Sequence, residues 1–260
     1  MGMRALASLL LALACASALA QVKDNGPTTI VITYKSPLEK RAAFRAYMEG
    51  PGVRQLEQWK KDGVFQDYQV LATSFAGEHV GQFDITVFLD FAAFTDVARW
   101  KEIDRRMPGG LSAEALALAG IDTTTIAYPI GRAAAARRDP SKAAYVIGLY
   151  EIEVGPAEYT KYAKGYVEPQ LKGWLDGGAM TAYAMYQSHP YQRPALSKWT
   201  FLLVLEYTDL LALAASDDVK ERVRVTLEKN AAWKALNDGK ASMRKAKGFI
   251  FADAITLPPR

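Results

Sequence analysis

Residues 83–91 read FDITVFLDF, and residues 199–207 read WTFLLVLEY. In each stretch apolar side chains recur at every second position among β-branched and aromatic residues, which predicts a β-strand with one apolar face. Each stretch also carries an acidic residue just before its last aromatic residue, Asp90 in the first and Glu206 in the second. Two such similar strands, 116 residues apart, indicate an internal repeat.

Aromatic residues on both sides of these strands support the repeat. They match at a nearly constant offset of 115 or 116 residues, so the sequence predicts two copies of one unit. The matched pairs include Tyr34 and Tyr150, Trp59 and Trp174, and Tyr68 and Tyr183.

Each copy reads as strand, helix, strand, strand, helix, strand, which is the ferredoxin-like order. Gly50-Pro51 should break or kink the first helix of copy one, and Gly165 with Pro169 should disturb its counterpart. The predicted fold class is α+β, with two tandem ferredoxin-like repeats whose sheets close on each other into a barrel. The predicted divisions are residues 1–20 (signal peptide), 21–131 (first repeat), 132–142 (linker) and 143–260 (second repeat).

The element order and several short patterns resemble the dimeric α+β barrel superfamily in a fused, two-copy form. The similar members are NIPSNAP-like and antibiotic-biosynthesis-monooxygenase-like proteins. The resemblance covers about residues 28–256, and no catalytic motif is matched, so it assigns no active residue. The superfamily that it implies includes oxygenases, isomerases and haem enzymes. The fold alone therefore does not indicate which function this chain has. The patterns are Tyr145 to Tyr150, Gly155-Pro156, Gly177-Gly178 and Leu205-Glu206-Tyr207.

The first twenty residues are typical of a secretory signal peptide. Arg4 precedes an apolar run from Ala5 to Ala18, and Ala18-Leu19-Ala20 predicts cleavage before Gln21. The run has 14 residues, whereas a membrane span needs ~20. We therefore expect a periplasmic or secreted protein without a membrane span, with a lipid anchor on Cys15 as the alternative.

Composition narrows the chemistry further. Cys15 is the single cysteine and would leave with the signal, which excludes thiol catalysis and disulfides in the mature chain. The net charge is only +4, and export argues against nucleic acid as a partner. The basic clusters at Arg132 to Arg138 and Lys240 to Lys247 are interpreted as a solvated linker and a solvated helix end.

Alternation along residues 83–91 and 199–207 predicts which side chains face the barrel interior. The apolar set from Phe83 to Phe91, and its counterpart from Trp199 to Tyr207, should lie under the helices. Asp84, Thr86, Asp90 and Glu206 should face inward. Two carboxylates in a low-dielectric space would split their pKa values, which makes Asp90 and Glu206 candidate catalytic acids or bases. The alternative is a structural role at the wet end of the strand.

Further candidates come from histidines and tyrosines. The two histidines, His79 and His189, fall in the loops after the second strand of each copy. His189 is a candidate catalytic base or haem ligand, with Arg193 beside it as a candidate ligand-binding residue; the alternative is a surface loop. Tyr68, Tyr183 and Thr86 are candidate substrate-binding residues, with core packing as the alternative for the tyrosines.

The predicted function is binding or processing of a small, mostly apolar molecule in the barrel, with aromatic molecules among the candidates. One alternative is an interaction scaffold with a solidly packed barrel, and another is a haem-handling protein with His189 or His79 as the ligand. No cofactor is identified, and the chain is expected to be a monomer or a homodimer. The sequence contains no P-loop, no GxGxxG dinucleotide fingerprint, no GxSxG elbow and no HExxH motif.

Overall fold

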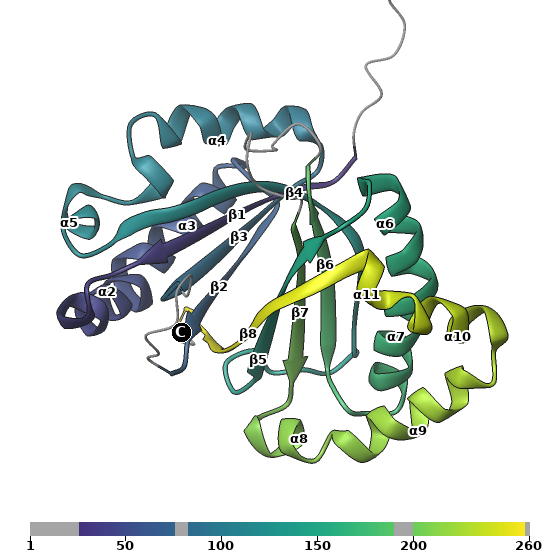
Figure 1. Cartoon of the computed structure of the whole chain (residues 1–260). Helices are drawn as coiled ribbons and strands as arrows, with labels where there is room; N and C mark the ends of the chain where they lie inside the picture. The colour runs from purple at the N-terminus through teal and green to yellow at the C-terminus, as the bar shows by residue number, and fades with distance from the viewer. Residues whose placement is uncertain (1–25, 76–82, 190–199, 258–260) are drawn as a thin grey trace, which may run out of the picture.

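A computed structural model describes residues 26–75, 83–189 and 200–257, so the predicted signal peptide, His79 and Arg193 lie outside the described part. Eight antiparallel strands close into one barrel in the order β1-β3-β2-β8-β5-β7-β6-β4 (Figure 1). The strands are β1 (Thr28–Lys35), β2 (Asp67–Thr73), β3 (Ile85–Phe91), β4 (Gly120–Ala134), β5 (Ala144–Ile152), β6 (Ala182–Ser188), β7 (Thr200–Tyr207) and β8 (Arg244–Ala254).

The two halves of the barrel have the same strand order. Strands β4-β1-β3-β2 form the first half and β8-β5-β7-β6 form the second, and the halves join where β2 meets β8 and where β4 meets β6. Tyr68 pairs with Leu89 in the first half, and Tyr183 pairs with Leu205 in the second. The α+β fold and the closed barrel are therefore confirmed.

Helices lie on the outside of the barrel (Figure 1). Instead of breaking at Gly50-Pro51, the first helical segment continues through a π-helical turn, Met48–Gly52, and its counterpart does so at Ala163–Val167. Pro51 lacks an N–H, and the wider turn absorbs that loss without ending the helix. The helices are α2 (Arg41–Tyr47), α3 (Val53–Lys61), α4 (Val97–Asp104), α5 (Ala113–Leu116), α6 (Pro156–Tyr162), α7 (Glu168–Asp176), α8 (Leu210–Ala214), α9 (Asp217–Glu228), α10 (Ala231–Asp238) and α11 (Lys240–Met243).

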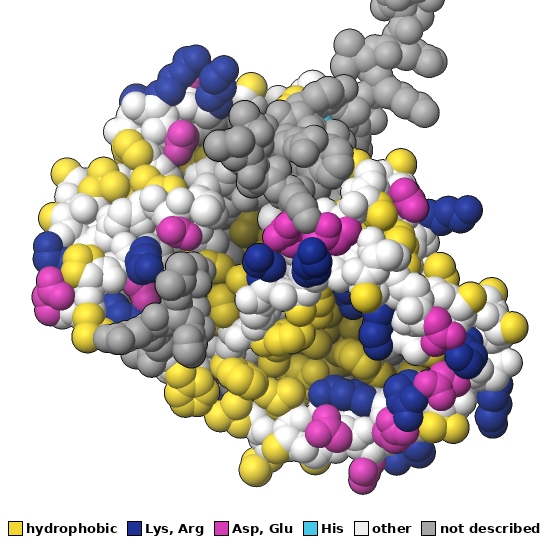
Figure 2. Space-filling view, in the orientation of Figure 1, with side chains coloured by type: hydrophobic (Ala, Val, Ile, Leu, Met, Phe, Trp, Pro, Cys, Tyr) yellow, Lys and Arg dark blue, Asp and Glu magenta, His cyan; other side chains and the backbone are white. Residues whose placement is uncertain are grey.

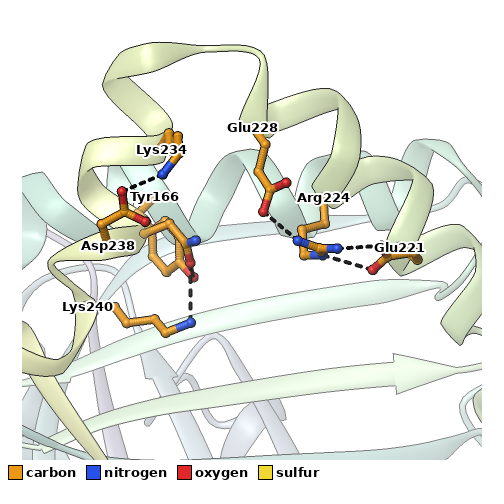
Figure 3. A network of polar contacts seen from close by, with 8 residues as sticks. Tyr166, Glu221, Arg224, Glu228, Lys234, Asp238 and Lys240 are labelled. Atoms are coloured by element: carbon orange, nitrogen blue, oxygen red, sulfur yellow. Dashed lines mark hydrogen bonds and ion pairs between the residues drawn. The ribbon is translucent and has the colours of Figure 1, made fainter.

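The exposed faces of α9 and α10 carry chains of charged side chains (Figure 3). Arg224 pairs with both Glu221 and Glu228, and Lys234 pairs with Asp238. Exposed pairs of this kind add little stability, so these helices depend on their packing against each other, α7 and the Ala163–Val167 turn. Among the described residues, no helix is long and apolar enough to cross a membrane.

Three apolar clusters follow from strand alternation. Two lie between the helices and the outer faces of the two half-sheets, and the third fills the barrel interior. The outward set of β3 and β7 is confirmed for the residues within the strands, because Leu89 and Leu205 pack against helices while Phe88 and Val204 point inward.

The prediction was wrong for Phe83 and Asp84. Phe83 belongs to the interior cluster, and Asp84 binds Arg41 of α2 at 2.6 Å and accepts the Ser36 N–H at 2.6 Å. The paired strand begins only at Ile85, so alternation does not extend to the two residues before it. The interior itself is packed at mid-barrel, where Phe88 stacks on Tyr186 with ring centres 5.2 Å apart.

Candidate functional site

A cavity of about 510 Å³ opens at one end of the barrel. Its volume lies within the range of roughly 300–1,000 Å³ that is typical of ligand pockets. Both halves of the barrel contribute walls, as do the segment between β4 and β5 and the residues that follow β8. The lining includes the side chains of Phe88, Asp90, Arg138, Tyr145, Tyr186 and Glu206.

Glu206 is the most deeply buried charge of the cavity wall, with 2% of its surface exposed. Its Oε2 accepts hydrogen bonds from Arg138 Nη1 at 2.7 Å and from the Tyr145 hydroxyl at 2.9 Å. Its Oε1 accepts one from the Thr181 hydroxyl at 3.0 Å. A carboxylate tolerates burial only when it is paired and hydrogen-bonded, and Glu206 meets both conditions through side chains.

Asp90 lies at the same cavity on the opposite half of the barrel. Its Oδ1 accepts a hydrogen bond from the Thr29 hydroxyl at 2.6 Å, and its Oδ2 accepts one from Arg132 Nη1 at 3.0 Å. Each carboxylate therefore has its own arginine partner. The expected carboxylate–carboxylate pair is replaced by two carboxylate–arginine pairs, one from each half.

Tyr145 supplies a neutral donor beside this charge. Burial, followed by the nearby charge of Glu206, raises the pKa of Tyr145 well above its usual value. Burial also raises the pKa of Tyr186, with the charge of Asp90 acting in the same direction. Both phenols stay protonated at neutral pH, so the cavity presents hydroxyl groups and aromatic rings beside its ion pairs.

Tyr68 and Tyr183 line the edge of the cavity, but their rings face the helices. The Tyr68 hydroxyl donates to Glu57 Oε2 at 3.3 Å, and burial raises the pKa of Tyr183. On β2 and β6 the interior-facing positions belong to their neighbours, such as Leu71 and Tyr186. The two tyrosines thus occupy equivalent places at the rim, each between sheet and helix.

Thr86 and His189 lie away from this cavity. Thr86 is fully buried on β3, four residues or roughly 13 Å along the strand from Asp90. His189 follows β6 at the end opposite Ala182, the residue that pairs with Glu206, which separates the two by roughly 20 Å. The structure therefore brings Asp90 and Glu206 to one cavity and leaves Thr86 and His189 outside it.

The surroundings of His189 bear on haem or metal binding. Its ring stacks on Phe94 with centres 5.1 Å apart and packs edge-on to Tyr128 at 6.2 Å. Burial lowers the pKa of His189, so the ring is neutral at pH 7. It does not line the cavity, and within the described ranges no group of three His, Cys, Asp or Glu side chains could hold a metal. His189 is therefore not placed to act as an axial haem ligand at the cavity.

Arg132, Arg138 and Tyr145 are the cavity residues that sequence reasoning missed. The interpretation of Arg132 to Arg138 as a solvated linker was wrong for its two end residues, because both arginines bind the cavity carboxylates. A usable signal existed: three arginines, Arg132, Arg137 and Arg138, lie at the end of the strand that closes the first half or just after it, and two acidic residues occupy equivalent positions on the repeated third strand.

Solved structures with this fold are similar along most of the chain. A candidate monooxygenase from Lactobacillus acidophilus NCFM has a TM-score of 0.53 and 10% sequence identity, over 89% of this chain and 95% of that one. Another, from Fusobacterium nucleatum subsp. nucleatum ATCC 25586, has a TM-score of 0.50 and 11% identity, over 89% and 93%.

An anthrone oxidase-like protein also matches, with a TM-score of 0.50 and 11% identity over 91% of this chain and 94% of that one. No family model matches the sequence, and a search of curated proteins finds no match. The similarity therefore concerns the fold. The chain has the dimeric α+β barrel fold, with both halves of the barrel joined in a single chain.

Proposed function

We propose that the protein binds a small, mostly apolar organic molecule in the barrel-mouth cavity, and that it does so outside the cytoplasm after loss of residues 1–20. The observation that carries the proposal is the cavity itself, about 510 Å³ in volume with a buried, fully hydrogen-bonded Glu206 in its wall. Few polar groups held rigidly among apolar and aromatic walls are typical of ligand sites.

The cavity offers different contacts at its base and at its rim. Phe88, Tyr186 and Val204 supply apolar surface toward the packed mid-barrel. Arg132 and Arg138 stand at the rim, where their side chains are 55% and 41% exposed. Each guanidinium has five N–H donors, and its carboxylate partner occupies only part of them. A ligand with an apolar body and an oxygen acceptor at one end suits this arrangement.

The names of the structural neighbours support a small organic ligand. Two are candidate monooxygenases and one is anthrone oxidase-like, and all three cover nearly the whole barrel. The interaction-scaffold alternative is less well supported, because the interior is packed at its middle and open at one mouth.

Mass spectrometry of compounds released from the purified protein tests the proposal. Ala184 lines the cavity, and Ala184→Phe should narrow it and obstruct a ligand without adding charge. We expect the wild type to release a small organic compound and the folded Ala184→Phe variant to release little or none. Ala212→Phe, on the surface helix α8, is the matched control and should release as much as the wild type.

Two outcomes would contradict the proposal. One is that wild type and Ala184→Phe release the same compounds in the same amounts. The other is that neither releases any compound and Ala184→Phe leaves every measured property unchanged. Either result would favour a barrel that acts as an interaction scaffold.

A further inference from the structure

A half-buried cation lies in the helix–sheet layer of the second half, away from the barrel-mouth cavity. Arg244 is the first residue of β8, and its guanidinium carbon lies 4.1 Å from the centre of the Tyr150 ring and 5.7 Å from that of Phe201. Its Nη1 donates one hydrogen bond, to the Tyr159 hydroxyl at 3.3 Å. Within the described ranges it pairs with no carboxylate. Most of its five N–H groups therefore lack a protein acceptor.

Two tyrosines near Arg244, Tyr159 and Tyr162, also have hydroxyl protons that no described protein atom accepts. Tyr162 is 2% exposed, and its buried hydroxyl makes no hydrogen bond. Its ring centre lies 5.6 Å from that of Tyr159, the tyrosine that binds Arg244, and burial raises the pKa of Tyr162. The Tyr159 hydroxyl accepts from Arg244, so its own proton remains available. A cluster that presents only donors is chemically complementary to an anion.

The first half of the barrel provides an internal comparison. Tyr34 is the counterpart of Tyr150, but its hydroxyl donates to the carbonyl oxygen of Gly109. Phe44 stands at the position of Tyr159 and packs on Tyr34 with ring centres 5.8 Å apart. The equivalent place is thus apolar and satisfied. Because the first half folds in the same way without a cation at this place, the fold itself does not require Arg244.

Apolar surface adjoins the cation. The first half buries Ile32 completely, whereas the equivalent residue of the second half is Gly148. Beside Gly148, Phe249 is 55% exposed, and its ring centre lies 5.9 Å from that of Tyr150. Figure 2 shows this face of the second half hollowed and lined by apolar side chains, with basic side chains at its edge.

We propose that Arg244, Tyr159 and Tyr162 bind the carboxylate of a small aromatic acid whose ring lies against Tyr150 and Phe249. A planar carboxylate accepts two parallel hydrogen bonds from a guanidinium, and charge-assisted bonds of this kind are among the strongest in proteins. The site is separate from the barrel-mouth cavity, because Arg244 and Ala254 lie at opposite ends of β8, roughly 30 Å apart.

Calorimetric titration with benzoate tests the site, and benzamide serves as the neutral probe of the same shape. Wild type should bind benzoate and should bind benzamide roughly tenfold more weakly or worse, a difference of about 1.4 kcal/mol. Arg244→Met should weaken benzoate binding by roughly tenfold or more. Phe249→Ala, at an exposed position, should weaken it by a smaller factor.

Two variants act as controls. Arg224→Met removes the same charge from the exposed face of α9 (Figure 3) and should bind benzoate as the wild type does. Ala184→Phe narrows the barrel-mouth cavity without releasing an arginine and should leave benzoate affinity unchanged, so failure here and failure of the proposed function are distinguishable.

Tyr162→Phe removes a single oxygen and keeps the test valid if Arg244→Met does not fold. It should weaken benzoate binding several-fold, since one hydrogen bond to the charged ligand is lost. The proposal is overturned by a wild type that does not bind benzoate, by equal binding of benzamide, or by unchanged affinity in Tyr162→Phe.

Discussion

At the residue scale, Arg138 and Glu206 contribute unequally to stability. Arg138 is 41% exposed, whereas Glu206 has only 3% of its side chain exposed. Arg138→Met would strand a buried carboxylate and should lower the free energy of unfolding by about 2 kcal/mol or more. Glu206→Gln leaves an arginine that water can solvate and should cost roughly 1 kcal/mol. Urea denaturation measures both values.

Arg105→Met is the matched control, because Arg105 pairs with Glu102 on the exposed surface. It should not change the urea midpoint measurably. If Glu206→Gln proved more damaging than Arg138→Met, the carboxylate would have to be held mainly by Tyr145 and Thr181.

His189 gives a prediction of pH dependence. Burial lowers its pKa below the usual 6.5, so the unfolded chain takes up a proton that the folded chain resists. The stability linked to the neutral ring is complete above about pH 6.5 and is lost progressively as the pH falls further. His189→Phe should therefore lose less stability than wild type between about pH 7 and pH 5, as urea titrations at each pH would show. Parallel curves for the two proteins would contradict this.

At the element scale, Trp233 anchors α10 to the rest of the second half. It is 4% exposed, its ring centre lies 5.1 Å from that of Tyr166, and its Nε1 donates to the Tyr166 carbonyl oxygen at 3.1 Å. Trp233→Ala should lower the free energy of unfolding by about 3 kcal/mol or more because it leaves a cavity. Leu211→Ala on α8, where the side chain is 80% exposed, should have almost no effect. If Trp233→Ala and Leu211→Ala lowered the free energy of unfolding equally, α10 would be only loosely attached to the rest of the second half.

Element order and strand faces could be predicted because they depend on local patterns. Matched aromatic residues such as Tyr68 and Tyr183 indicated the repeat, and alternation assigned the outward and inward faces within the third strands. The path of the helix at Pro51 could not be predicted, because a local signal for disturbance does not distinguish a break from a π-helical turn.

The site was predictable only in part, for a related reason. Asp90 and Glu206 stood out as acidic residues on apolar strands, but Arg132 and Arg138 lie 42 and 68 residues from them along the chain. The first pair bridges β3 and β4 within the first half-sheet, and the second joins the segment after β4 to β7, so no local sequence pattern reveals either of them. The sequence could not decide whether His189 lies at the same end of the barrel as the carboxylates or at the far end, because that depends on the direction of β6 in the barrel.

At the scale of the whole molecule, each half depends on the other. The β2–β8 and β4–β6 pairings close the barrel, and interior side chains such as Leu71 and Phe88 are buried by the opposite sheet. A fragment of residues 21–137 should therefore associate or aggregate, since it exposes two unpaired strand edges and an apolar sheet face. Light scattering and circular dichroism test this, and a stable monomeric fragment with cooperative unfolding would contradict it.

The cavity at the barrel mouth is also a property of the whole molecule, because its walls come from both halves and the segment between them. A crystal structure of the protein purified from its native source tests this claim most directly. The result we predict is density for a small organic molecule against Phe88 and Tyr186, with a polar atom within hydrogen-bond distance of Arg132 or Arg138. A cavity closed by rearranged side chains, with the Glu206–Arg138 pair turned out to solvent, would contradict it.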